Sequence, residues 1–286
     1  MVQNLMRKLS PSFMKALQEG FLSAILKTVH VDKDLDFQIR DNYINLYFKG
    51  NSLLKLSQVS DKKYKVDIHP KFITALTIPS HIESKKDTEL FLQAIPYLKE
   101  NISRIGKTSL EIEYEQLIIR ANNREKRNNS EYFFVDRQYK IASERFDLMG
   151  FYWSKYNRRK HQIVSPCLME VKFALNGDIS NVHEQLQSYY QLVKENVEEI
   201  SSDLEQSFYQ RLELGLYEQP ESRLEAMKTL RFSRELSSFQ FILALVDYNP
   251  FSRRLNMDNL KELPFSKQIK IFSSGFAMWQ KVLTTV

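Results

Sequence analysis

Residues 239–248 (FQFILALVDY) form a nearly continuous apolar run that is rich in β-branched and aromatic side chains. The run is far shorter than the roughly 18 residues of a membrane-spanning helix, and it predicts a strand buried inside a sheet. Such a strand needs helices against its sheet, which is typical of an α/β architecture.

The segments around this run predict the rest of that sheet. From residue 109 onward the patterns follow the order α-β-β-β-α-β-β, which predicts a central mixed β-sheet flanked by helices. The expected elements are a helix over 109–123, strands over 131–141, 145–153 and 167–175, helical pattern from 181 to 214 with a break near 201–202, and strands over 239–248 and 269–276.

The first 85 residues predict a separate α+β module. Ser10 and Pro11 begin a helix, and apolar residues recur at helical spacing from Phe13 to Ile25. Four short runs rich in β-branched and aromatic residues follow, and they predict an antiparallel meander. The runs cover 37–40, 43–49, 52–58 and 63–69.

A polar stretch over 82–87 (IESKKD) is the expected boundary between two domains. We therefore expect a helix-plus-meander module over residues 1–85 and a second domain over residues 86–286. Pro96 interrupts a helical pattern that starts near residue 88, which predicts a break or kink there.

Composition excludes several classes of protein. The chain has only 7 glycines and neither glycine-rich phosphate-binding motif, so a glycine-paved nucleotide loop is not expected. Its single cysteine, Cys167, excludes disulfides and cysteine-based zinc sites and favours a reducing, cytoplasmic location. The first residues lack the apolar core of a secretory signal, and no membrane association is expected. The net charge of +6 permits a phosphate-bearing partner without requiring one.

Charged residues interrupt two of the predicted strands. In the strand over 167–175, Glu170 and Lys172 occupy one face while the other face is apolar. In the preceding strand, Asp147 lies within an otherwise apolar run. Burial of these charges is unfavourable by several kcal/mol unless they are paired or bind a ligand.

Adjacent strands would bring Asp147 and Glu170 together, with Lys172 beside them. Two neighbouring carboxylates repel unless a proton or a cation lies between them. Carboxylate oxygens suit Mg²⁺, and Lys172 could orient the attacking water or help to deprotonate it. The pattern indicates metal-assisted hydrolysis of a phosphodiester. The alternative interpretation is a structural ion pair between Glu170 and Lys172.

Asp147, followed by Glu170-Val171-Lys172 on the next strand, resembles the D…(D/E)-x-K signature of the PD-(D/E)XK nucleases, the restriction-endonuclease-like superfamily. The order of elements over residues 109–276 is also similar to that of the family core. Gln185 and Tyr189 match a Q-x-x-x-Y helix that often follows the motif strand. The proline that commonly precedes the aspartate is replaced by Phe146.

The resemblance implies roles for individual residues. Asp147, Glu170 and the main-chain carbonyl of Val171 would hold Mg²⁺ or Mn²⁺, and Lys172 would position the attacking water. Gln185 would support this site, together with one acidic residue of the helix over 109–123. Glu111, Glu113 and Glu115 compete for that acidic position, and we favour Glu111 because it neighbours the apolar stripe of its helix.

Basic clusters are the candidate nucleic-acid contacts. They are Arg124 and Arg127 after the first core helix, and Arg158, Arg159 and Lys160 between the two acidic strands. Each cluster taken alone is also compatible with an ordinary solvated loop.

Together these observations predict a metal-dependent nuclease, acting on DNA, with a restriction-endonuclease-like core. The N-terminal module could recognise substrate, form a homodimer or bind a partner protein. The alternative is a non-catalytic nucleic-acid-binding or protein-interaction protein that retains a nuclease-like fold. Under the first hypothesis, Asp147→Ala or Lys172→Ala abolishes cleavage and leaves the fold intact.

Overall fold

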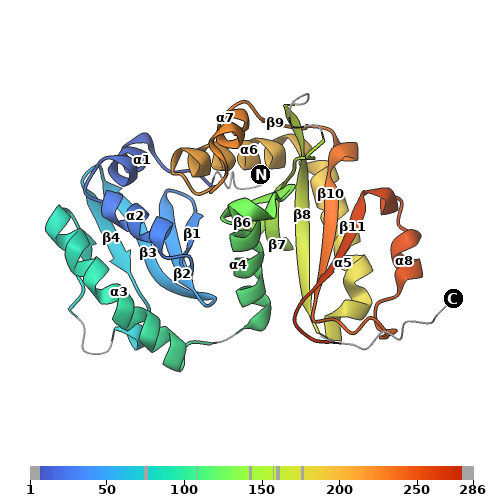
Figure 1. The fold of residues 1–286 in the computed structure, drawn as a ribbon, viewed down its shortest axis with the longest axis horizontal. Coiled ribbons are helices and arrows are strands. Elements are labelled where there is room, and N and C mark those ends of the chain that lie inside the picture. The colour runs from blue at the N-terminus through green and yellow to red at the C-terminus, as the bar shows by residue number, and fades with distance from the viewer. Residues whose placement is uncertain are drawn as a thin grey trace.

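Two β-sheets with helix α4 (Leu110–Asn123) between them organise the chain (Figure 1). The computed structural model describes residues 7–73, 77–107, 109–141, 144–156, 158, 162–174 and 177–278. The architecture is mixed α/β, as predicted.

The N-terminal sheet is the expected antiparallel meander, with one strand more than the four predicted. Its strands pair in chain order: β1 (Asp36–Ile39), β2 (Tyr43–Phe48), β3 (Asn51–Ser60), β4 (Lys63–Asp67) and β5 (His81–Ile82). The single helix expected before it is wrong, because two helices are present, α1 (Pro11–Gln18) and α2 (Ser23–Val31). The chain turns between them at Gly20, where a Cβ would lie only 2.8 Å from the Cα of Ala16.

Helix α3 (Lys85–Ile105) continues through Pro96, so of the break or kink expected there the break is absent. An internal proline destabilises a helix by about 3 kcal/mol or more. Burial of Phe91, Leu98 and Ile102 in the N-terminal core offsets that loss, since each buried apolar side chain contributes roughly 1.5–3 kcal/mol. The N-terminal core therefore continues past residue 85, where the domain boundary was expected, and includes α3.

The C-terminal sheet is mixed, with strand order β11-β10-β8-β7-β6. β8, β10 and β11 are parallel to one another, whereas β6 and β7 pair antiparallel to their neighbours. The strands are β6 (Tyr132–Ile141), β7 (Glu144–Tyr152), β8 (Ile163–Phe173), β10 (Gln240–Val246) and β11 (Ile269–Ser274), with the short β9 (Arg231–Phe232) paired to β8.

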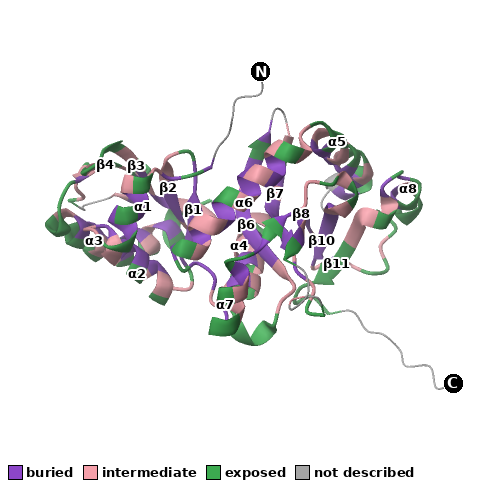
Figure 2. Cartoon of the chain, turned by 90° about the horizontal axis from the view of Figure 1, so that it is seen from above, coloured by how far each residue is buried: buried purple, intermediate pink, exposed green. Residues whose placement is uncertain are grey.

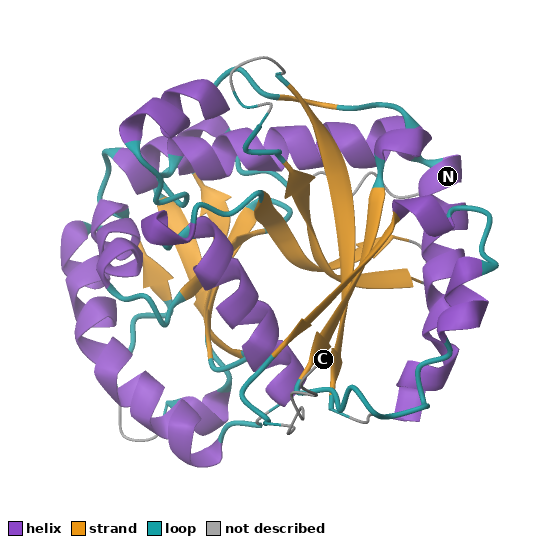
Figure 3. Ribbon diagram, turned by 45° about the vertical axis from the view of Figure 1, so that its right-hand side comes forward, coloured by secondary structure: helices purple, strands orange, loops and turns teal. Residues whose placement is uncertain are grey.

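Helices lie on both faces of this sheet (Figure 3). α4 packs on one face through Ile119, and α5 (Val182–Glu195) and α6 (Val197–Glu213) pack on the other through residues such as Leu186 and Phe208. The short helices α7 (Glu221–Met227) and α8 (Met257–Lys261) complete the second face. Figure 2 shows the buried strands inside and the exposed helix faces outside. No helix in the described part of the chain is both long and apolar enough to cross a membrane.

The break between α5 and α6 falls at Asn196 and not at the predicted Ser201-Ser202. A serine can disfavour a helix when its hydroxyl competes for nearby backbone groups. Here the buried Ser201 hydroxyl donates to the carbonyl of Ser233 at 2.8 Å, so it has a tertiary partner and the helix continues.

Candidate metal and catalytic site

The candidate site lies where β7 and β8 part. Their pairing runs from Tyr152 opposite Ser165 to Leu148 opposite Met169 and goes no further along β7. At the next residue of β7, a side chain takes the place of the backbone hydrogen bond between the strands. The Oδ2 atom of Asp147 accepts the backbone N–H of Val171 at 2.9 Å.

Gln138 orients the other oxygen of Asp147. Its Nε2 donates to Asp147 Oδ1 at 3.2 Å and to Glu115 Oε1 at 2.7 Å. Gln138 has a φ of 52°, in the left-handed region that non-glycine residues seldom adopt. This amide therefore joins two carboxylates on different elements, β7 and α4.

Glu170 and Lys172 lie side by side on β8, as the alternation predicts. Both are buried, and Lys172 Nζ lies 2.7 Å from Glu170 Oε1. Tyr189 donates its hydroxyl to Glu170 Oε2 at 2.7 Å, and Gln185 Nε2 donates to that hydroxyl at 2.7 Å. Gln185 thus reaches the site through Tyr189, and Tyr189 is the residue of this helix that touches Glu170.

Among the three glutamates at the start of α4, the structure brings Glu115 into the hydrogen-bonded cluster. Glu115 is only 2% exposed and accepts from both Gln138 and Arg137. Glu111 lies one turn earlier, where its charge acts on Asp147 and Lys172. Glu113 lies on a different side of α4, in the wall of a cavity. In the sequence, Glu115 lies four residues before Ile119, so the two share one face of the helix. Both are buried, and this spacing is the signal that could have identified Glu115.

The acids of this cluster hold their protons strongly. Burial, reinforced by the charge of Glu170, raises the pKa of Asp147 to about 7. Burial and the charge of Asp147 raise the pKa of Glu115 to about 8, against the opposing effect of Arg137. The negative charges are therefore incompletely balanced by the protein's own cations.

Lys172 also holds its proton strongly, but burial acts on its pKa in the opposite direction. Burial by itself lowers the pKa of its ammonium, but the charges of Glu170, Asp147 and Glu111 outweigh burial and hold that pKa above its ordinary value. Lys172 is accordingly protonated near neutral pH. Orientation and charge stabilisation are compatible with this state, whereas deprotonation of water by Lys172 is not.

The donor chemistry fits a hard divalent cation. Asp147, Glu170 and the Val171 carbonyl offer oxygen atoms, and Mg²⁺ commonly takes one or two protein carboxylates while keeping several waters. No group of three or more His, Cys, Asp or Glu residues with metal-site geometry occurs among the residues that the structure describes. A two-carboxylate site is consequently the arrangement that these residues could supply.

The N-terminal module reaches this cluster through Arg137. The Arg137 guanidinium donates to Asp36 of β1 at 2.8 Å and to Glu115 of α4 at 3.3 Å. It also lies 4.1 Å from the centre of the Tyr47 ring of β2. Arg137 is 2% exposed, so these contacts join the module to the site inside the protein.

The candidate nucleic-acid contacts do not gather around the acids. Arg124 donates from all three guanidinium nitrogens to Glu218 and to carbonyls of Val29, His30 and Leu35, as a structural arginine does. Arg158 contacts the ring of Trp153 and the carbonyl of Ser130.

Trp153 directly follows the last residue of β7, whereas Asp147 lies near the start of that strand. A rise of about 3.3 Å per residue puts Trp153 roughly 20 Å from Asp147. Of the five predicted contacts, Arg127 is exposed on the loop after α4, and Arg159 and Lys160 lie outside the described residues.

Two cations that the sequence analysis missed lie closer to the acids. Lys140 on β6 is directly opposite Arg145 on β7, both are exposed, and Arg145 is two residues from Asp147. Neither forms an ion pair with a described residue. Like charges directly opposite on neighbouring strands are destabilising, which makes this pair suited to an anionic partner.

Comparison of the chain with family models, with curated proteins and with solved structures finds no match.

The raised pKa values predict a pH-dependent stability in the absence of metal. Asp147 and Glu115 bind protons more tightly in the folded chain, so their stabilising contribution is complete below about pH 4 and is lost as pH rises through about 7 and 8. We expect the free energy of unfolding in EDTA to fall by on the order of 2–4 kcal/mol between pH 5 and pH 8. Urea unfolding from pH 5 to pH 8 measures it. The double variant Asp147→Asn/Glu115→Gln should flatten the slope, and an unchanged slope would contradict the assignment.

Proposed function

We propose that the protein is a metal-dependent nuclease with a restriction-endonuclease-like core that hydrolyses phosphodiester bonds of DNA with Mg²⁺ or Mn²⁺. One observation carries the proposal. Asp147 and Glu170 come from neighbouring strands at the point where the strands part, and Lys172 is the cation beside them.

In this proposal Asp147, Glu170 and the Val171 carbonyl would hold the ion. When bound, the ion lowers the pKa of the attacking water and offsets negative charge on the phosphate. Lys172, fixed by Glu170 and protonated, stabilises the charge that builds on the phosphate oxygens. Tyr189 and Gln185 hold Glu170 in place, and Gln138, which also donates to Glu115, holds Asp147.

Lys140 and Arg145 supply the substrate contact. They are exposed at the end of the β6–β7 pair nearest Asp147, and a phosphate backbone would relieve the repulsion between them. DNA is the substrate we propose. Partner binding or dimerisation through the N-terminal module stays a prediction, as does a cytoplasmic location.

Cleavage of plasmid and single-stranded DNA tests the proposal. We expect the wild-type chain to cut with Mg²⁺ or Mn²⁺ and not in EDTA. Lys172→Met should lower the rate by at least about 10²-fold, because it removes a positioned cation. Lys194→Met, on the exposed side of α5, is the matched control and should cut normally. Circular dichroism checks the fold, since Lys172→Met leaves Glu170 buried without its cation.

A non-catalytic binding protein is the second candidate, and one observation favours it. Both carboxylate oxygens of Glu170 already have partners, Lys172 and Tyr189, as in a structural ion pair. Thermal unfolding with Mg²⁺ or Mn²⁺ separates the candidates. A nuclease site should raise the melting temperature with increasing metal concentration, and that rise should be lost in Asp147→Asn. An unchanged melting temperature would favour the binding protein.

A further inference from the structure

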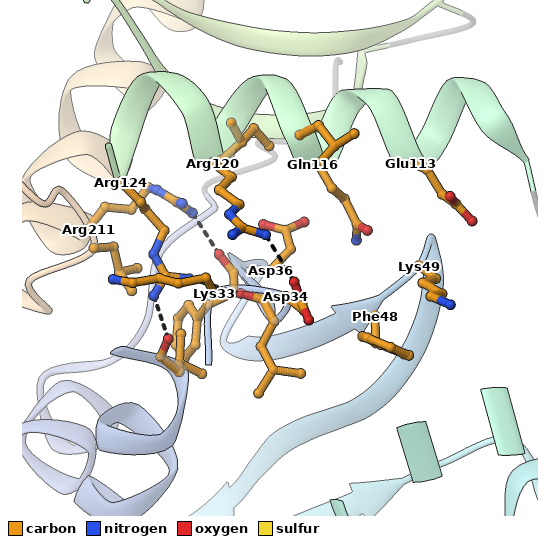
Figure 4. A pocket seen from close by; sticks show the side chains of 16 residues that line it. Lys33, Asp34, Asp36, Phe48, Lys49, Glu113, Gln116, Arg120, Arg124 and Arg211 are labelled. Atoms are coloured by element: carbon orange, nitrogen blue, oxygen red, sulfur yellow. Dashed lines mark hydrogen bonds and ion pairs between the residues drawn. The ribbon is translucent and has the colours of Figure 1, made fainter. Parts of the chain in front are cut away.

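A cavity of about 420 Å³ lies between α4 and the N-terminal sheet, with Asp36, the partner of Arg137, in its lining. Pockets that bind small organic ligands commonly have volumes of about 300–1,000 Å³. Helix α4 supplies one wall, and β1, β2 and the end of α2 supply the other (Figure 4). Because Glu111 and Glu115 are not among the lining residues, this cavity is distinct from the candidate metal site.

Arg211 gives the cavity a buried positive charge without an acidic partner. The side chain is 3% exposed, and a guanidinium is always charged in proteins. Its Nη1 donates to the carbonyl of Phe37 at 3.0 Å and to Gln38 Oε1 at 3.5 Å, and the guanidinium is hydrogen-bonded to the Tyr217 hydroxyl, whereas its Nε has no partner. Among the described residues no carboxylate pairs with it. A buried charge in this state is strongly unfavourable, and an anion in the cavity would offset it.

Gln116 gives the cavity a second unsatisfied donor. Its Oε1 accepts the N–H of Gly50 at 3.1 Å, which fixes the orientation of the amide. Its Nε2 is buried without any partner. Figure 4 shows this amide directed from α4 into the cavity. A ligand that carries a hydrogen-bond acceptor would satisfy it after a small shift of the amide, because the nitrogen has almost no exposed surface.

The lining has two chemically different ends with an apolar wall along it. Arg124 and Arg211 lie at one end, and Glu113 and Lys49 lie at the other, with Gln116 between them (Figure 4). Phe37, Phe48, Leu35, Leu117 and Ile119 form the apolar part of the wall. An elongated ligand would therefore meet a cationic end, an apolar middle, and a far end that offers both donors and acceptors.

Basic residues outnumber acidic residues in the lining of the cavity, which favours an anionic ligand. Lys33, Lys49, Arg120, Arg124 and Arg211 face the cavity together with only Asp34, Asp36 and Glu113. Arg120 pairs with Asp34, and Lys33 and Arg124 pair with Glu218 outside the lining. Arg211 is left as the buried cation that an anion would pair with.

We propose that this cavity binds a nucleotide, with its phosphate at Arg211 and its base near Gln116 and Glu113. A nucleoside monophosphate combines the three required parts, namely an anionic group, a flat ring for the apolar wall, and a base edge with donors and acceptors. The proposal is independent of nuclease activity, because the binding site uses none of the residues assigned to metal or catalysis.

Isothermal titration of the full chain in EDTA with AMP, GMP, CMP and UMP tests this proposal. We expect at least one nucleotide to bind with a dissociation constant on the order of 10–100 μM. Gln116→Met and Arg211→Lys should each weaken binding at least about tenfold. Gln116→Met is the variant less prone to misfold, because Arg211 also holds the carbonyl of Phe37. Inorganic phosphate alone should bind at least about tenfold more weakly, since it lacks the base.

Two variants serve as controls. Gln93→Met, on the exposed face of α3, and Asp147→Asn, in the candidate metal site, should both leave the dissociation constant unchanged. The proposal is overturned if no nucleotide binds at about 5 mM, or if the two cavity variants bind as wild type does. Equal affinity for phosphate alone, or loss of binding in Asp147→Asn, would overturn it as well.

Discussion

Asp147→Asn should lower Mg²⁺-dependent DNA cleavage by at least about 10³-fold. Asp147 is the proposed metal ligand that spans the gap between β7 and β8, and its amide analogue keeps the shape but loses the charge. The same variant should be more stable than wild type in EDTA at pH 8, by about 1–3 kcal/mol, because it removes an acid whose folded pKa is raised to about 7. Cleavage rates and urea unfolding measure the two effects.

This pair of effects separates a functional acid from a structural one. Replacing an acid that is retained for stability would lower the free energy of unfolding. Replacing an acid that is held against burial and against repulsion from Glu170 raises it. Asp67→Asn, at the exposed end of β4, is the matched control and should change neither quantity. An Asp147→Asn chain that cuts DNA within about threefold of the wild-type rate would remove Asp147 from the catalytic assignment.

Arg137→Met should destabilise the protein by about 3–5 kcal/mol, the effect of breaking a buried ion pair. Arg137 is among the largest fully buried side chains, and it joins Asp36 of the N-terminal module to Glu115 of α4. Its removal leaves two buried acids without their cation. The free energy of unfolding by urea at pH 9, above the raised pKa of about 8 of Glu115, measures the loss.

A triple-mutant cycle assigns this loss to charge rather than to packing. Adding Asp36→Asn and Glu115→Gln to Arg137→Met should recover a large part of the lost stability, because the uncompensated acids are then neutral. Arg127→Met, at an exposed arginine, should stay within about 0.5 kcal/mol of wild type. If the added substitutions recover nothing, Arg137 acts mainly by filling space.

The strands that carry the candidate site follow from local pattern. β6, β7, β8, β10 and β11 lie where alternation and apolar runs predict them, because a strand's two faces repeat every two residues. The same alternation places Glu170 and Lys172 on one face of β8, apart from Met169 and Val171 on the other.

The choice among similar residues does not follow from local pattern. The sequence favours Glu111 among the three glutamates, and the approach of Gln138 and Arg137 from β6 is what brings Glu115 into the cluster. Arg124 and Arg158 are candidate nucleic-acid contacts in the sequence, yet tertiary packing gives them carbonyl and aromatic partners. Pro96 predicts a helix break, but burial of α3 in the N-terminal core keeps the helix continuous.

The sequence by itself determined the mixed α/β class, the meander, and the placement of Asp147, Glu170 and Lys172 on two neighbouring strands, because these depend on residues within one element or in adjacent ones. The tertiary structure alone decided that the N-terminal module touches the acid cluster through Asp36 and Arg137, and that a cavity forms beside α4. Those contacts join residues about a hundred positions apart, and the energy of a buried charge depends on which neighbour the completed fold brings to it.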